Sequence, residues 1–453
     1  MTTPDSAALG FADVSLITAA RLALAGDDPG LWTVLDLRAR SYWWRGPAVP
    51  DPSPEVAVVL AACDRSGRVR ESAVTDIARR GNPALWPVLA LRCADWVPEI
   101  RARAREVALR CLGELPGAAF QAFAPLALLL AKRAEGQWLA GVVEANLREG
   151  PPEVLAVALA SSNRVVRRAA YRLAMGRLPL DRLLSAVRSD DDTVIRLHCA
   201  EALIRMGDLD LTRSLLSSGT AAVRAEAVHA LGSAGERGPA EAALTDRNRI
   251  VRETAQAVLR RAGSDPGGAY RALLAVSPTP AVIAGMGETG GDTELLRPFL
   301  THPVTRVRVE TVRALRRLGD TPVGLLTPML ADPAAAVTRQ VVVSLRGHEL
   351  DMSFLLRQLG VDQPPHSRFA AYRLLTARDA WTRIETNLAL LDDAYLGGRA
   401  HADIASWLRN SAATSYLVPT AERVTRVDAL LRESTTLGEH TVSLVRFHMG
   451  LHR

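Results

Sequence analysis

The sequence predicts an all-α protein, an α-solenoid of stacked antiparallel helix pairs with divergent helical caps at both ends. Three observations lead to this prediction. Aromatic residues make up only 5% of the chain, while small and aliphatic residues abound, a composition that suits closely packed helices. Very few segments alternate polar and apolar residues with period two, as a half-buried strand does. A helical pattern recurs about every thirty residues, which is the signature of a repeat architecture.

The recurring pattern is clearest in residues 305–319, which read TRVRVETVRALRRLG. Apolar and small residues occupy one face of an amphipathic helix that ends at a glycine. With Arg308 as the anchor, equivalent arginines follow one another at steps of 31, 66, 29, 28, 28 and 56 residues, and weaker copies continue to residue 399. The anchor arginines are Arg70, Arg101, Arg167, Arg196, Arg224, Arg252 and Arg308.

Each unit is expected to contain two helices. Residues 209–216 form a short first helix, and residues 222–235 form the second helix up to its glycine. The next unit repeats this arrangement with residues 240–244 and 250–263. Asp or Asn in the turn before the second helix is a natural N-cap, because its side chain accepts from free N–H groups of the first turn.

The flanks divide the chain into three parts. Residues 1–56 are expected to form a helical cap and a proline-rich extended joint (38–56), residues 57–350 the repeat array, and residues 351–453 divergent C-terminal repeats or a cap. Longer helices are expected at 380–395 and 418–433. The apolar run 115–131 contains two prolines and is short for a membrane span, so it is expected to be a buried helical hairpin.

The repeat pattern of Val-Arg, spaced alanines and Leu-Gly resembles the HEAT-repeat family, specifically the short bacterial PBS-lyase-type HEAT-like repeats. The resemblance extends from about Gly67 to Gly347. It implies a curved solenoid whose second helices line the concave side, and most members of the family are binding scaffolds. The motif specifies fold well and function hardly at all.

The charge on the second helices points to the class of partner. At the positions one, two and five after each anchor, six arginines stand against six glutamates. A groove for duplex DNA gains affinity from clustered positive charge, which interleaved carboxylates oppose. A protein or peptide partner is therefore expected, and nucleic acid is disfavoured. The residues concerned are Arg103, Arg168, Arg172, Arg313, Arg339 and Arg373, with Glu71, Glu106, Glu201, Glu226, Glu253 and Glu310.

A candidate binding patch falls on three consecutive second helices. One aromatic, two histidines, two glutamates and two arginines would gather there as a polar binding surface, with an acid–base set and a plain solvated face as alternatives. Its members are Arg168, Tyr171, Arg172, His198, Glu201, Glu226 and His229. Exposed Trp and Arg often anchor interfaces. Trp43, Trp44, Arg45 and Trp96 are therefore candidate interface anchors, with packing of the cap and turn as the alternative.

Other motifs are interpreted as structural. The anchor arginines are expected to pair with turn carboxylates or carbonyls of neighbouring units, with Asp192, Asp246 and Asp332 as partners. Gly285, Gly287 and Gly290 match a dinucleotide fingerprint, but the next segment continues the repeat. His448 and His452 share one helix face without a third ligand of matching spacing. No catalytic residue, metal or cofactor is therefore expected.

The sequence thus predicts a non-enzymatic scaffold that binds a protein or peptide on the concave face of a HEAT-like solenoid. The alternative is a DNA-binding or DNA-repair solenoid of the glycosylase kind, with Glu201 and Tyr171 nearest to the needed acid and aromatic. A bilin lyase-like role is a third interpretation without mapped residues. Four cysteines without Cys-x-x-Cys spacing and an N-terminus unlike a signal peptide predict a cytoplasmic protein that does not enter the membrane.

Overall fold

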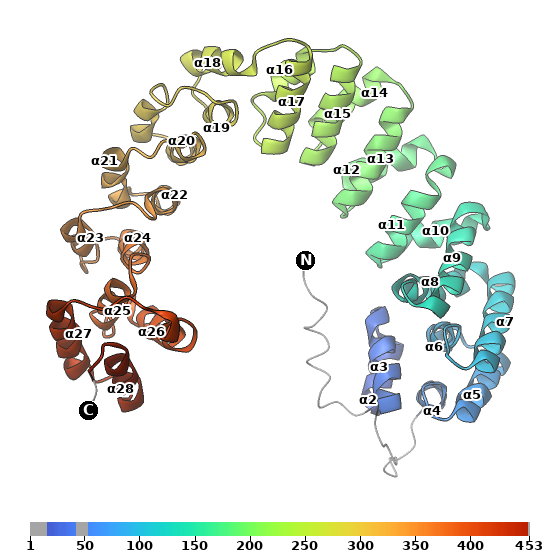
Figure 1. Cartoon of the computed structure of the whole chain (residues 1–453). Helices are drawn as coiled ribbons and strands as arrows, with labels where there is room; N and C mark the ends of the chain where they lie inside the picture. Colours follow the sequence, from blue (N-terminus) through green and yellow to red (C-terminus); the bar gives the residue numbers. More distant parts are fainter. Residues whose placement is uncertain (1–15, 42–52, 452–453) are drawn as a thin grey trace. The chain divides into compact units, whose positions relative to one another are not determined.

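The computed structural model describes residues 16–41 and 53–451, and this part of the chain is helical throughout, with 74% helix and no strand. Figure 1 labels the helices along the chain. The all-α prediction is confirmed. The chain divides into two compact units, unit 1 (Met1–Ala227) and unit 2 (Val228–Arg453). Within each unit, helices that follow one another pack side by side, as in a helical solenoid.

Unit 1 begins with a pair of helices before the first repeat and then continues in pairs. Its helices are α2 (Leu16–Ala25), α3 (Pro29–Ser41), α4 (Pro54–Ala62), α5 (Gly67–Arg80), α6 (Trp86–Arg92), α7 (Pro98–Glu114), α8 (Pro116–Leu130), α9 (Gln137–Glu149), α10 (Pro152–Ala160), α11 (Arg164–Leu173), α12 (Leu180–Ser189), α13 (Thr193–Arg205), α14 (Leu209–Ser214) and α15 (Ala221–Ser233), whose last residues belong to unit 2.

Unit 2 continues the pairs, and several of its first helices shorten to one turn or to a 3₁₀ turn. Its helices are α16 (Gly238–Ala243), α17 (Arg249–Arg261), α18 (Pro266–Val276), α19 (Pro280–Glu288), the 3₁₀ helix η5 (Arg297–Thr301), α20 (Thr305–Arg317), α21 (Val323–Leu326), α22 (Ala335–Leu345), α23 (Met352–Gln358), α24 (Pro365–Leu375), α25 (Ala380–Leu388), α26 (Gly397–Asn410), α27 (Ala421–Glu433) and α28 (Glu439–His448).

The repeat period persists where the sequence motif fades. Successive second helices contact one another, as α11 does with α13 in unit 1, and as α20 does with α22 and α22 with α24 in unit 2. The 56-residue gap before Arg308 contains the pair α18 and α19, and the 66-residue gap after Arg101 contains α8 and α9. Buried cores follow each stack, with clusters over residues 17–170, 171–227 and 372–449.

Side-chain caps and glycines set the ends of the second helices. The side chain of Asp192 accepts from the N–H of Val194 at the start of α13, and that of Asn248 accepts from Ile250 at the start of α17. Just after α17, Gly263 adopts a φ of +76°, which a side chain would disfavour. The predicted N-caps and glycine stops are therefore confirmed at these helices.

The anchor arginines hold the turns of the repeat in place. Each of the seven donates to the carbonyl six residues earlier, in the turn before its own helix, at 2.7–3.0 Å for the Nη1 donors. The other edge of the guanidinium reaches the next unit, as in Arg308, whose Nε and Nη2 donate to the Asp332 carboxylate at 2.8 and 2.9 Å. Arg70 makes the same pair of bonds to Asp95.

The expected arginine partners are confirmed only in part. Asp332 binds its anchor Arg308 as expected. Asp246 offers Arg252 its backbone carbonyl, within the same turn, while the Arg252 guanidinium binds the Glu288 carboxylate. Asp192 pairs with Arg168 rather than with the anchor Arg167, whose Nη1 donates to the carbonyls of residues 161 and 162 and whose nearest carboxylate is that of Asp190, at 3.8 Å.

Four predicted boundaries are wrong. The run 115–131 is one helix, α8, not a hairpin, because Pro125 removes only one hydrogen bond and α6, α7, α9 and α10 pack around it. The helix expected at 380–395 ends at Leu388, and Asp393 caps the turn that follows. The helix expected from 418 begins at Ala421 after the N-cap Thr420. Residues 38–41, expected in the extended joint, are helical, because α3 continues to Ser41, and residues 42–52 of that joint lie outside the described residues.

Candidate functional site

Part of the candidate patch gathers at a pocket in unit 1, about 540 Å³ in volume, which we name the mixed-charge pocket. Arg172, from the end of α11, meets His198 and Glu201 from α13 there. Arg205, which the repeat positions did not single out, also lines this pocket. His198, Glu201 and Arg205 are spaced i, i+3 and i+7, so one face of α13 presents all three. The lining residues are Arg172, Met175, Gly176, Leu183, His198, Glu201, Ala202, Arg205 and Met206.

The polar rim of the mixed-charge pocket carries both signs of charge. The side chain of Arg172 is 61% exposed, and its nearest carboxylate oxygen, on Glu144, is 3.7 Å away. Arg205 Nε donates to the backbone carbonyl of Glu201 at 3.2 Å, and the Glu201 side chain lines the pocket. Met175, Leu183 and Met206 supply the apolar part of the lining. Met206 is 55% exposed.

Two members of the patch do not reach the pocket. Arg168 donates through Nε and Nη2 to the Asp192 carboxylate at 2.7 and 3.0 Å. The hydrogen bond from Arg168 lowers the pKa of Asp192, and the same bond raises the pKa of Arg168. Tyr171 is only 1% exposed, and burial raises the pKa of its hydroxyl. The ring belongs to the core cluster that also contains Leu183 and Cys199, which counting positions from the anchor did not reveal.

Glu226 and His229 lie on α15 and line neither this pocket nor the one in unit 2 described next. A ring nitrogen of His229 is 3.4 Å from Arg261 Nη1. Among the candidate anchors, Trp96 is 68% exposed, and the Arg70 guanidinium lies 5.5 Å from its ring centre. Trp43, Trp44 and Arg45 lie outside the described residues.

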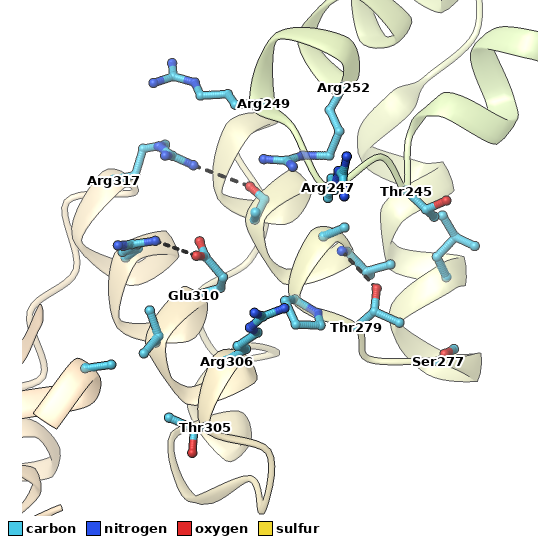
Figure 2. A pocket seen from close by; sticks show the side chains of 18 of the residues that line it. Thr245, Arg247, Arg249, Arg252, Ser277, Thr279, Thr305, Arg306, Glu310 and Arg317 are labelled. Atoms are coloured by element: carbon cyan, nitrogen blue, oxygen red, sulfur yellow. Dashed lines mark hydrogen bonds and ion pairs between the residues drawn. The ribbon is translucent and has the colours of Figure 1, made fainter. Parts of the chain in front are cut away.

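A larger pocket in unit 2, about 1230 Å³, was not found from the sequence, and we name it the arginine-lined pocket. It lies among α17, α19, α20 and the start of α22 (Figure 2). Of its arginines, the charge count on the second helices included only Arg313. The other six arginines lie in the turn before α17, in the first four residues of α17, and at positions of α20 that were not counted. A count at fixed repeat positions therefore could not find them. They are Arg247, Arg249, Arg252, Arg306, Arg316 and Arg317.

The four cysteine thiols are buried in the core. Burial raises the pKa of the Cys63, Cys93 and Cys199 thiols to about 12, so none of them is a thiolate at neutral pH. Residues 16–41 and 53–451 hold no group of three or more side chains able to bind a metal ion. None of the described helices has the length and hydropathy needed to cross a membrane.

The glycine motif at 285–290 belongs to helix packing. Gly285 and Gly287 lie inside α19, where a Cβ on Gly287 would come within 2.7 Å of the Ala314 backbone on α20. Gly290 follows the helix with a φ of +78°. A dinucleotide site needs a strand before these glycines, and here a helix contains two of them.

Comparisons with known proteins add little. No family model matches the chain, and no curated protein matches it. Among solved structures, an engineered protein of the Northeast Structural Genomics Consortium matches at 16% identity and a TM-score of 0.16, with 96% of this chain and 97% of that chain covered. This likeness is too weak to bear on fold or function.

Proposed function

We propose that this chain is a non-enzymatic, bacterial, HEAT-like repeat protein of the cytoplasm that binds a protein or peptide partner. The observation that carries the proposal is the mixed-charge pocket, where Arg172, His198, Glu201 and Arg205 share the lining with apolar side chains. The repeat helices serve as a frame, and residues outside the repeat consensus form the binding surface.

The composition of the mixed-charge pocket suits a protein surface. Protein interfaces have an apolar centre and a polar, solvent-accessible rim. Met175 and Met206 supply flexible thioethers, which adapt to the shape of an apolar side chain. The rim offers cations at Arg172 and Arg205 and a carboxylate at Glu201, so it complements a peptide that carries both charges. A polyanion would be repelled by Glu201.

The separation of the patch residues supports binding over catalysis. An acid–base set needs its groups within hydrogen-bond reach of one substrate. Of the patch members, Arg168 donates its hydrogen bond to the Asp192 carboxylate, and the Tyr171 hydroxyl is buried with a raised pKa. The glycosylase-like alternative needs an exposed aromatic beside Glu201, and Tyr171 does not supply one. DNA binding of another kind is supported by one feature, the arginine-lined pocket of unit 2.

A peptide selected from a random library on the wild-type protein tests this proposal. We expect the double variant Arg172→Glu/Glu201→Arg to lose at least about tenfold in affinity, because two rim charges are reversed. The matched control is Arg188→Glu/Glu149→Arg, which exchanges two exposed charges of unit 1 outside the pocket. Equal affinity for all three proteins would contradict the proposal, as would selection that yields no binding peptide while duplex DNA binds with a steep salt dependence.

A further inference from the structure

The arginine-lined pocket combines guanidinium groups from two sides. In Figure 2, Arg249 and Arg252 extend from the α17 side, Arg306 and Arg317 from the α20 side, and Thr279 lies at the start of α19. Seven arginines line the pocket against one lining carboxylate, that of Glu310, within the part of unit 2 that the structure describes. The arginines are Arg247, Arg249, Arg252, Arg306, Arg313, Arg316 and Arg317.

Neighbouring carboxylates compensate only part of this charge. Arg313 pairs with Glu310 at 2.6 Å, and Arg249 pairs with Glu253 at 2.7 Å. The Glu288 carboxylate is shared, because it binds Arg252 and lies 3.7 Å from Arg317. Seven cations thus face three carboxylates.

Three guanidinium groups of the pocket have no anionic partner among the described residues. Arg316 is held by neutral groups, donating to the Gln340 side chain at 3.2 Å and to Ser344 Oγ at 3.0 Å. Arg247 and Arg306 are exposed and make no ion pair with any residue between 53 and 451. The pocket therefore has a positive surplus of several charges, and two of the cations are free to bind a ligand.

A buried hydrogen-bond network lies behind one wall of the pocket, at Arg252. Gln256 Nε2 donates to the Glu288 carboxylate at 3.0 Å and lies 3.3 Å from the Tyr270 hydroxyl. The Tyr270 hydroxyl donates in turn to the Leu244 carbonyl at 2.8 Å. This network fixes Glu288, and Glu288 fixes the Arg252 guanidinium at the pocket wall. Arg252 thus shapes the wall while its charge is offset by Glu288, and the ligand is left to the arginines that have no carboxylate partner.

The like charges also raise the electrostatic energy of the empty pocket. Burial lowers the pKa of Arg316, and the neighbouring charges of Arg313 and Arg317 lower it further. Such repulsion weakens the folded state unless an anion offsets it. The start of α19 adds the positive end of the helix dipole, although Pro280 has no N–H and the Val282 N–H is bound by Thr279 Oγ1. The hydroxyls of Ser277 and Thr279 line the same wall.

We propose that the arginine-lined pocket binds a small molecule that carries several phosphoryl groups. Guanidinium forks match phosphate oxygens in pairs. From Arg306 to Arg317, the α20 arginines span eleven residues, about 16 Å along the helix, so one phosphate cannot reach them all. No aromatic side chain belongs to the lining within the described part of unit 2, so the pocket offers no platform for stacking a nucleobase.

This inference is independent of the peptide site, which lies in unit 1. It rests on the surplus of arginines without a carboxylate partner, on the volume of the pocket that they line, and on the hydroxyl-bearing start of α19. Failure of one proposal leaves the other standing, because the two pockets share no residue.

Calorimetric titration of the full chain with inorganic tripolyphosphate at low ionic strength tests the inference. The test variant is Arg247→Glu/Arg306→Glu, which removes no ion pair of the described residues. Its second substitution places a carboxylate in the first turn of α20, where the helix dipole favours negative charge. The control is Arg260→Glu/Arg339→Glu, which makes the same charge change at exposed positions of α17 and α22 outside the pocket.

We expect tripolyphosphate to bind the wild type more tightly than inorganic phosphate does, and the test variant to bind it about tenfold more weakly or worse. The control should stay within about threefold of the wild type, since distant surface charges act through screened fields. Absence of tripolyphosphate binding, or equal loss in both variants, would overturn the inference. It would also be overturned if hexaglutamate or a single-stranded oligonucleotide bound the pocket more tightly than tripolyphosphate.

Discussion

At the scale of single residues, the anchor arginine is a structural part of every clear repeat. One edge of its guanidinium closes the turn before its own helix, and the other edge reaches the next unit, as Arg308 does with Asp332. The sequence could predict this role because the arginine recurs with the period. It could not predict that Arg168, rather than the adjacent Arg167, binds the Asp192 carboxylate, because this depends on which of the two arginines faces the next turn.

The ionic cluster around Asp95 is a fully buried example of an anchor arginine that binds a carboxylate of the next unit. The Asp95 carboxylate accepts from Arg70 at 2.9 and 3.0 Å, from Arg92 at 2.7 Å and from the Val97 N–H at 3.0 Å. Burial alone would raise the pKa of Asp95, but the hydrogen bonds from Arg70 and Val97 and the charge of Arg92 lower it. The ionised carboxylate therefore stabilises the folded state.

Replacing Asp95 with Asn should lower the free energy of unfolding by about 3 kcal/mol at pH 7, because Arg70 would be left buried without an anion and Arg92 would keep only its ion pair with Asp36. Because the folded pKa is depressed, the contribution is complete above the unfolded value of about 3.9 and is lost as pH falls through the folded pKa. The difference between wild type and variant, measured by denaturant unfolding, should shrink below about pH 4.

The exposed Asp181→Asn substitution on α12 is the control for that series. It should leave unfolding at pH 7 within about 0.5 kcal/mol of the wild type. A pH-independent difference between wild type and the Asp95 variant would show that the carboxylate charge is not what stabilises the cluster.

At the scale of helices, the sequence predicted second helices better than first helices. Second helices have a long apolar face and a glycine stop, as in α17 and α20, and α17 also has a side-chain N-cap at Asn248. Several first helices are short, and one of them is the 3₁₀ helix η5 rather than an α-helix, a difference that depends on local backbone geometry rather than on periodicity. The pair α18 and α19 has no Val-Arg motif, yet it packs as a unit.

The contact of α19 with α20 gives an element-scale prediction. Gly287→Ala should destabilise the protein by about 1–3 kcal/mol, because the new Cβ would meet the Ala314 backbone at 2.7 Å and force two helices apart. Gly141→Ala, inside α9, meets no atom within 4 Å. It should instead stabilise the protein by about 0.5–1 kcal/mol, since alanine is the better helix former.

Thermal and denaturant unfolding, followed by circular dichroism, distinguish these outcomes. If Gly287→Ala were neutral, the close approach of α19 and α20 would not contribute to stability, and the motif at 285–290 would need another explanation.

At the scale of the whole molecule, the repeats form the helical scaffold, and residues outside the repeat consensus form the mixed-charge pocket and the arginine-lined pocket. The sequence located three residues of the mixed-charge pocket, Arg172, His198 and Glu201, because they project from second helices. It missed the arginine-lined pocket, because arginines from a turn, from α17 and from α20 meet there only after folding. Arginines and glutamates were equal in number at the counted positions of the second helices, so that count did not reveal the local surplus of positive charge at this pocket.

Hydrogen–deuterium exchange of the full chain, with and without a peptide selected on the wild type, tests the central claim most directly. The claim is that the partner is bound by helix faces within the repeat array. We expect slower exchange in residues 164–173 and 193–205, which form α11 and α13, and little change elsewhere in unit 1. Protection confined to other helices, with these two unchanged, would contradict the account.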